Sequence, residues 1–194
     1  YKRQDLCSLR PDVVRLTKVC EMKFDKKGKM LHARFADAFI RSKARLTYQE
    51  AFTMLKGHDK GEVPSMVREA WKLASILRRN RYAKGALDLD FPEVRAVMDK
   101  DGRVTDIITE EYDESHQLIE ECMLAANEAV ALTLKNRNRP TIYRVHEEPD
   151  SAKLFEFGQL CKLYGHPVHD IGQRQYLNEL MKSIKGSPDE QLLK

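Results

Sequence analysis

A long segment with helical periodicity, near residues 113–135, places the strongest constraint on how this chain folds. At about 100° per residue, its apolar side chains form two adjacent rows that extend well beyond a single stripe. The first row is Leu118, Cys122, Ala125, Ala129 and Leu132, and the second is Ile119, Met123, Ala126 and Val130. Asp113 or Ser115 is suited to cap the first turn. We therefore predict a mostly buried helix, which requires a domain with a sizeable core.

Polar residues on the same helix fall in two directions. Gln117, Glu121 and Glu128 share a narrow strip that is predicted to face water and needs no functional explanation. Glu120 and Asn127, seven residues apart, share a different direction. Their apolar neighbours there are Leu124, Ala131 and Leu134. Because a buried, unpaired carboxylate costs several kcal/mol, Glu120 is expected either to pair with a core arginine, the more common arrangement, or to line a substrate channel.

Alternating apolar and polar residues predict several strands. Residues 13–24 and 30–40 alternate on either side of the sequence DKKGK, which is typical of a β-hairpin. The stretch GALDLDFPEVRAVMDKDGRVTDII indicates two or three strands around a DKDG turn, and TIYRVH after Pro140 is predicted to be a short buried strand. Neither DKKG nor DKDG is followed by the glutamate that ends an EF-hand loop, so both are interpreted as turns.

Four further helices are predicted. The first covers residues 47–56, with a threonine cap at its start and Gly57 at its end. The second begins at Ser65, after the polar linker GHDKGEVP, and its last turn is rich in arginine. Two more lie near residues 150–163 and 172–184. The fold class is therefore predicted to be α/β (mixed α+β), with a mixed β-sheet and flanking helices.

Composition narrows the class of protein. Hydrophobic residues make up 42% and charged residues 33% of the 194 residues, which is typical of a soluble globular domain. No apolar run approaches the roughly 20 residues that cross a bilayer, and the first residues lack the apolar stretch of a signal peptide, so a cytoplasmic protein is expected. The four cysteines show no CxxC spacing, which argues against a zinc site and a disulfide framework and favours reduced, core-filling thiols.

The net charge of +4 conceals an asymmetry. Residues 1–84 contain 21 Lys and Arg against 9 Asp and Glu, whereas residues 85–194 contain 13 against 21. The basic half could attract a polyanion. The basic side chains could equally well only solvate that surface, and charge alone does not decide between the two.

Five sequence blocks carry a family resemblance. In order, they are DLCSLRPDVVRLTKVCEMKFD, IRSKARLTYQEA, GALDLDFPEV, SHQLIEECMLAANEAVA and YRVHEEPD. They resemble successive blocks from the middle of the catalytic (RNB) domain of the ribonuclease II / ribonuclease R family, and HxLIEECMLAAN is the most specific of them. Together they span nearly the whole chain, so residues 1–194 are expected to be part of one RNB catalytic domain.

The resemblance implies a hydrolase that degrades single-stranded RNA from its 3′ end. Members of the family remove nucleoside 5′-monophosphates one at a time in a deep channel, where two divalent metal ions, taken to be Mg²⁺, activate water. They also carry OB-type domains that bind single-stranded RNA. The implied partners are therefore RNA, the rest of the RNB domain and those OB-type domains, without a membrane.

The resemblance assigns Tyr48 and Glu120 to catalysis and gives roles to further residues. Tyr48 in SKARLTY matches a tyrosine that lies against RNA close to the cleavage site, and Glu120 matches a glutamate that contacts the terminal nucleotides. The alternative for Tyr48 is an aromatic side chain that packs in the core at a helix start. Leu89 stands where several relatives have a phenylalanine that stacks on bases, so Phe91 is a candidate substitute.

Three further residues are candidate RNA contacts. Lys43 and Arg45 precede Tyr48 and could reach phosphates, although the alternative is that they solvate a strand end. Asn127 shares the direction of Glu120 and is assigned to RNA binding with it. His146 lies beside a predicted strand end, and a lone histidine of this kind is usually structural, so it is assigned no chemistry.

Two blocks that the family uses for chemistry do not occur in these residues. The metal ligands of the family come from a DxDDA-like aspartate cluster that precedes the first block, and a SPIRRY block follows the last. A fragment or a divided gene product is expected, inactive as a nuclease by itself and prone to self-association through exposed sheet edges. The alternatives are a noncatalytic RNA-binding or regulatory module and a purely structural fragment that binds no RNA.

Overall fold

The computed structural model describes residues 7–87, 93–110 and 112–193, which fall into two compact units. Unit 1 comprises the chain up to Arg78 together with Tyr112–Thr141, and unit 2 comprises Arg79–Glu111 and Ile142–Lys194. Helix α2 (Glu62–Ala83) runs from the first unit into the second. Among the described residues, no helix has both the length and the apolar character needed to cross a membrane.

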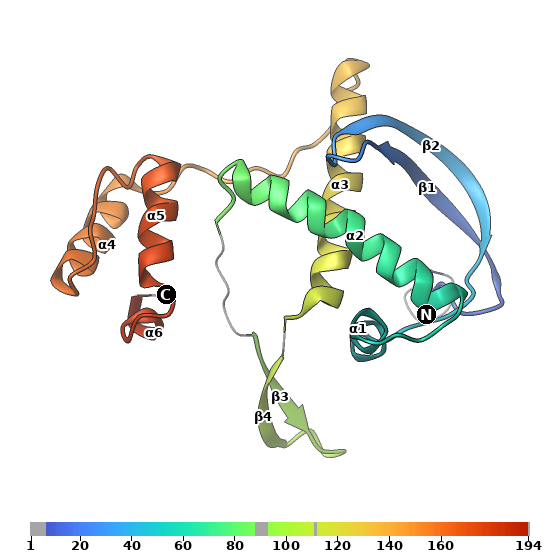
Figure 1. The fold of residues 1–194 in the computed structure, drawn as a ribbon, viewed down its shortest axis with the longest axis horizontal. Helices are drawn as coiled ribbons and strands as arrows, with labels where there is room; N and C mark the ends of the chain where they lie inside the picture. Colours follow the sequence, from blue (N-terminus) through green and yellow to red (C-terminus); the bar gives the residue numbers. More distant parts are fainter. Residues whose placement is uncertain (1–6, 88–92, 111, 194) are drawn as a thin grey trace. The chain divides into compact units, whose positions relative to one another are not determined.

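A long β-hairpin forms one part of unit 1 (Figure 1). Strands β1 (Val14–Phe24) and β2 (Met30–Arg41) pair antiparallel, and β1 also contacts helix α3. The Asp25 carboxylate accepts the backbone N–H groups of Lys27 and Lys29 at 2.8 and 2.9 Å, and Gly28 adopts a φ of 78°, which favours glycine. The predicted hairpin and its DKKG turn are confirmed.

The helices of unit 1 begin at well-formed caps. In α1 (Tyr48–Lys56), Thr47 and Glu50 form a capping box, and the Gly57 N–H closes the last turn on the Thr53 carbonyl. Helix α3 (Glu114–Asn136) is capped by Asp113, one of the two predicted candidates. Helix α2 begins three residues before the predicted Ser65, inside the polar linker. Pro64 is tolerated there because proline lacks a backbone N–H, and an N–H in the first turn has no acceptor within the helix.

The predicted faces of α3 were wrong. Within this fully described helix the buried residues are Ser115, Glu121 and Ala129, whereas Ile119 and Met123 of the second apolar row are exposed. Glu121 was predicted to face water but is only 3% exposed, because it points toward Arg78 of α2. A small alanine and an ion pair thus occupy the contact side of α3, while the described residues leave Ile119, Met123, Val130 and Leu132 exposed.

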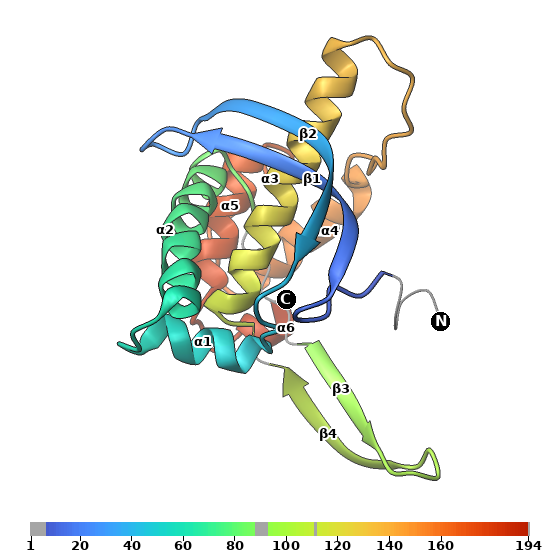
Figure 2. The same cartoon turned by 90° about the vertical axis from the view of Figure 1, so that its right-hand side faces the viewer.

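Unit 2 contains a second hairpin and three helices. Strands β3 (Glu93–Met98) and β4 (Val104–Glu110) pair antiparallel around a turn in which Asp99 accepts two backbone N–H groups. Helices α4 (Ser151–Leu163), α5 (Arg174–Ile184) and α6 (Glu190–Leu193) lie together in Figures 1 and 2. They share an apolar core of Cys161, Ile171, Leu180, Ile184 and Leu193. The predicted helices near 150–163 and 172–184 are confirmed.

The predicted fold class, mixed α+β, is confirmed, because the chain combines helices with antiparallel strands. The described strands form two separate two-stranded sheets instead of one mixed sheet. The segment TIYRVH is not a strand, since no described strand pairs with it, and Ile142 is 99% exposed. The cysteines also differ from the expectation, because Cys161 is buried but Cys7 and Cys122 are exposed.

Candidate functional site

Tyr48 packs against another aromatic ring in unit 1. It is the first residue of α1, and its ring stacks on the imidazole of His116 in α3, with centroids 3.7 Å apart and ring planes 20° apart. The Tyr48 side chain is nevertheless 48% exposed. One face of the tyrosine ring is therefore covered by His116, while the rest of the side chain is open to a ligand.

His116 is itself held by the cap of α3. Its Nδ1 lies 2.9 Å from Oδ1 of Asp113, the same oxygen that accepts the backbone N–H groups of Ser115 and His116. Burial alone would raise the pKa of Asp113, but hydrogen bonds from Ser115 and His116 outweigh it and keep the pKa below its ordinary value. Because an ionised carboxylate only accepts hydrogen bonds, Nδ1 of His116 is the protonated ring nitrogen, and its N–H donates a hydrogen bond to Asp113.

An ion pair joins the two helices that carry these rings. Lys56, the last residue of α1, donates a 2.5 Å hydrogen bond to Oε1 of Glu114, the first residue of α3. This hydrogen bond lowers the pKa of the Glu114 carboxyl. The contact connects the end of α1 to the start of α3, next to the Tyr48–His116 stack.

Glu120 lies one turn beyond His116 on α3 and has partners of two kinds. The Tyr112 hydroxyl donates a hydrogen bond to Oε2 of Glu120, and Arg78 Nη1 lies 3.6 Å from the same oxygen and 3.8 Å from Oε1 of Glu121. The Glu120 side chain is 36% exposed, whereas that of Arg78 is 18% exposed. The expected arginine pair is therefore present, and the carboxylate still reaches the surface.

These contacts form a continuous set, which we call the Tyr48–Glu120 cluster. The Tyr112 ring lies 6.0 Å from the His116 ring at 39°, so it links the stacked pair to Glu120. The members of the cluster are Tyr48, Arg78, Tyr112, Asp113, His116 and Glu120. The two residues that sequence analysis assigned to catalysis are thus connected through two aromatic rings, and both are partly exposed.

Of the other predicted site residues, the three that the structure describes are not members of this cluster. Lys43 and Arg45 are exposed in the segment between β2 and α1, and Asn127 is exposed on α3, two turns beyond Glu120. Leu89 and Phe91 fall in the part of the chain outside the described residues, so the predicted base-stacking position has no structural description.

Sequence analysis missed four members of the cluster. It treated Asp113 only as a helix cap, it treated Arg78 only as part of a basic helix end, and it gave no role to Tyr112 or His116. One signal was available, because His116 and Glu120 are four residues apart and such residues share a helix face. The contacts of Arg78 and Tyr48 with α3 join separate helices and left no local signal.

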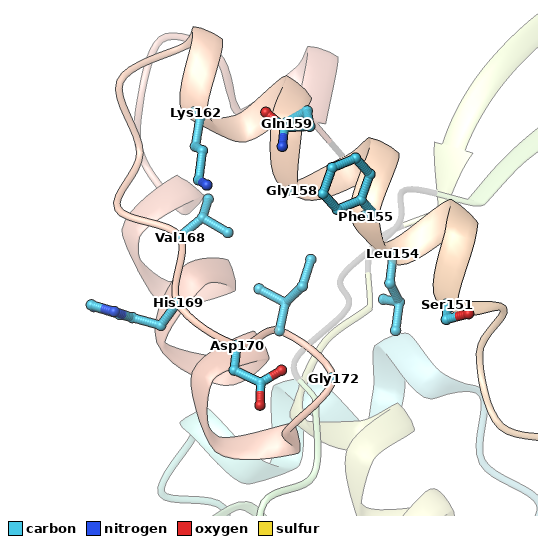
Figure 3. Close-up of a pocket in the computed structure, with 11 residues that line it drawn as sticks. Ser151, Leu154, Phe155, Gly158, Gln159, Lys162, Val168, His169, Asp170 and Gly172 are labelled. Carbon is cyan, nitrogen blue, oxygen red and sulfur yellow. The ribbon is translucent and has the colours of Figure 1, made fainter.

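A pocket of about 390 Å³ lies in unit 2, between α4 and the loop that follows it (Figure 3). Leu154 and Phe155 of α4 project on one side of it, Val168 lies on the other, and His169 is directed away. This lining offers apolar contact rather than a cluster of reacting groups. Across residues 7–87, 93–110 and 112–193, no group of three or more His, Cys, Asp or Glu side chains could hold a metal ion.

Comparison with known proteins gives one consistent family. Residues 3–194 match the model of the RNB domain. Ribonuclease R of Aquifex aeolicus is 36% identical over 97% of this chain and 28% of its own length, and ribonuclease R of Escherichia coli is 29% identical over 97% of this chain and 24% of its own. The chain thus spans about a quarter of the length of these relatives.

The similarity extends to three-dimensional structure. Mycoplasma genitalium RNase R, solved in complex with ribose-methylated single-stranded RNA, matches with a TM-score of 0.89 at 26% identity. The match covers 99% of this chain and 31% of the solved chain. The arrangement of helices and hairpins described above therefore occurs within a larger protein of known structure.

Proposed function

Because the chain belongs to the RNB-domain family, we propose that it forms part of a 3′-to-5′ exoribonuclease and that its Tyr48–Glu120 cluster holds the RNA strand. The observation that carries this proposal is the pairing of a half-exposed, ring-backed tyrosine with a partly exposed carboxylate in one connected set of contacts. The substrate is single-stranded RNA, and the products are nucleoside 5′-monophosphates.

The chemistry of the two side chains fits the sugar and base parts of a nucleotide. The open side of Tyr48 can stack against a base or pack against a ribose, an interaction that is worth roughly 1–3 kcal/mol per base. The Glu120 carboxylate repels phosphates but accepts hydrogen bonds from sugar hydroxyls and base N–H groups. Arg78 offsets part of the Glu120 charge, which reduces that repulsion.

Lys43 and Arg45 complete the proposed contact set as phosphate ligands. Both side chains are exposed, and both residues shortly precede Tyr48 in the chain. An RNA strand whose terminal base or sugar reaches the Tyr48 ring therefore passes close to them. Such contacts fix the position of the strand without reading its sequence. Asn127, exposed on the helix that carries Glu120, is proposed to contact the strand farther along α3. The solved RNase R relative with bound single-stranded RNA supports RNA as the ligand.

The hydrolytic step is proposed to require polypeptide other than these 194 residues. In the proposed enzyme, divalent metal ions such as Mg²⁺ supply the activated water, and residues of the remaining RNB domain hold them. The role of the present chain is to bind and orient the terminal nucleotides. We therefore expect the 194-residue chain alone to release no mononucleotides from labelled RNA in the presence of Mg²⁺.

The test uses the full-length polypeptide that carries this chain, with 5′-labelled single-stranded RNA and Mg²⁺. Tyr48→Ala and Glu120→Gln should each lower kcat/KM by about 10- to 100-fold, because each removes a direct contact to the terminal nucleotides. Matched controls in unit 2, Tyr164→Ala and Glu156→Gln, replace exposed side chains of the same types and should stay within about twofold of the parent. Equal rates for parent and cluster variants would refute the proposed site.

A further inference from the structure

The imidazole of His116 is fixed on two sides within unit 1. Its flat face stacks on Tyr48 at 3.7 Å, and its Nδ1 is 2.9 Å from the Asp113 carboxylate. Asp113 is fixed in turn, because Oδ1 also accepts the backbone N–H groups of Ser115 and His116 and the Ser115 hydroxyl. The His116 ring is therefore held in one orientation by the cap of α3.

Tyr48 without this support would have few restraints. It occupies the first position of α1, and its side chain is 48% exposed, so solvent leaves several rotamers open to it. The stacked imidazole favours one of these Tyr48 rotamers. In that rotamer one face of the tyrosine ring lies against His116, and the other face points away from it. A side chain that is ordered before binding loses less conformational entropy when the ligand binds. The stack therefore favours binding of a ligand to the Tyr48 ring.

We propose that His116 is a positioning residue, held by Asp113, that fixes the Tyr48 ring so that its open face meets the base or ribose at the RNA terminus. This inference rests on the proposed function, since Tyr48 must contact RNA for its orientation to matter. His116 itself lies behind the tyrosine ring and acts through it. Its contribution is expected in substrate binding and orientation, with no proton transfer to the reacting phosphate.

A purely structural role for His116 makes different predictions from a positioning role. The backbone N–H of His116 contributes to the α3 cap and stays in every substitution, so the side chain can be tested separately. His116→Phe keeps a flat ring for the stack and loses the hydrogen bond to Asp113. His116→Asn keeps a donor near the Nδ1 position and loses the ring. A positioning role through stacking predicts that phenylalanine restores activity better than asparagine.

The decisive experiment is a double-mutant cycle in the full-length polypeptide, measured as kcat/KM on single-stranded RNA. His116→Ala should lower kcat/KM by about 3- to 10-fold, the effect of freeing one ordered side chain. His116→Phe should recover part of that loss, because it restores the stacked ring but not the hydrogen bond to Asp113. In the Tyr48→Ala background, His116→Ala should cause no further loss, because there is no ring left to position. His169→Ala is the matched control, since His169 contacts the Tyr176 ring at 5.6 Å in unit 2, and it should have no effect.

The outcomes separate the two proposals. If Tyr48→Ala leaves kcat/KM unchanged, the proposed RNA site is wrong and the inference about His116 falls with it. If Tyr48→Ala lowers kcat/KM but His116→Ala does not, or if the two losses multiply in the double variant, the site stands and the positioning role of His116 is overturned. Equal recovery by asparagine and phenylalanine would also overturn the role of the stacked ring.

Discussion

The two units differ in the polar side chains that they bury. In unit 2 the buried positions of α4, α5 and α6 are mainly apolar, and Leu180 and Ile184 are almost completely enclosed. In unit 1 the polar Ser115 and Glu121 are buried as well as the apolar Val67, Ala74 and Ala129. Apolar packing stabilises a structure without fixing charge positions, whereas polar contacts cost desolvation but orient side chains. The candidate site lies in the unit that uses the second kind of contact.

Both units also leave apolar side chains uncovered, and in unit 2 Ile107 and Leu163 are 68% and 83% exposed. Leu16 and Phe39 face each other across the β1–β2 hairpin, and each is 76% exposed. Ile119 and Met123 of α3 are exposed as well. Such side chains are stabilising only where other polypeptide covers them, so in neither unit do the described residues enclose all of the apolar side chains.

Removing a buried apolar side chain from unit 2 should have the largest effect on stability. Leu180→Ala is expected to lower the free energy of unfolding of this unit by about 2–5 kcal/mol, because it leaves a cavity in the α4–α6 core. Hydrogen exchange of the α4 and α5 amides should accelerate accordingly. Leu16→Ala, at an exposed position of unit 1, should change stability by less than about 0.5 kcal/mol. Equal losses of unfolding free energy in Leu180→Ala and Leu16→Ala would contradict the proposed difference between the two units.

Breaking the ion pairs of Arg78 should have the next largest effect. Arg78→Met keeps the aliphatic stem but leaves Glu121 without this partner in a buried position, which should destabilise unit 1 by about 2 kcal/mol, below the usual range because Arg78 is partly exposed. Arg79→Met, at the exposed neighbouring position, is the control. Amide exchange along α3 measures the change, and unchanged exchange in Arg78→Met would argue against a stabilising role for these contacts.

Loss of a helix cap allows a matched comparison between the units. Asp113→Ala and Asp150→Ala each remove a carboxylate that accepts two backbone N–H groups, so each should cost about 1 kcal/mol. The substitution at Asp113 should also lower RNA turnover, because it releases His116, whereas the one at Asp150 should not. Turnover that falls equally in both variants would indicate that stability alone is responsible.

Asp113 also predicts a dependence on pH. Its folded-state pKa lies below its ordinary value of 3.8, so its contribution to stability is fully present above that value and disappears as the pH falls through the folded-state pKa. The stability difference between the parent and Asp113→Ala should therefore be constant near neutral pH and shrink below about pH 4. Denaturant unfolding across this range measures it, and a difference that grows with acid would contradict the lowered pKa.

The exposed ion pair between Lys56 and Glu114 should contribute least. Lys56→Ala is expected to cost about 0.5 kcal/mol or less, and salt should reduce the cost further, because both side chains are substantially exposed. The pKa of Glu114 should rise toward its ordinary value, since Lys56 is the main cause of its depression. An NMR titration of the Glu114 carboxyl would show this rise, and its absence would assign the depression to other groups.

Elements with strong local signals were predictable from the sequence. The period-two alternation around DKKG, the threonine before α1 and the aspartate before α3 act within a few residues of the chain, and each was confirmed. The faces of α3 were not predictable, because the burial of Glu121 depends on Arg78 from another helix. The segment TIYRVH has the composition of a strand, but a strand also needs a partner, and no described strand supplies one.

The candidate site was predictable only in part. The resemblance in SKARLTY and HQLIEE pointed to Tyr48 and Glu120, and the structure connects them through the rings of His116 and Tyr112. Their proposed contact with RNA stays a prediction. The stack of Tyr48 on His116 joins residues far apart in the chain, so only the folded arrangement reveals it.

A crosslinking measurement tests most directly whether the Tyr48–Glu120 cluster holds the RNA terminus. Single-stranded RNA with a photoreactive 4-thiouridine at its 3′ end is bound to the full-length polypeptide, irradiated and mapped by mass spectrometry. Attachment is expected at the start of α1 around Tyr48 or on α3 between His116 and Glu120, with loss of attachment in Tyr48→Ala. Attachment confined to α4–α6, unchanged in Tyr48→Ala, would contradict this expectation.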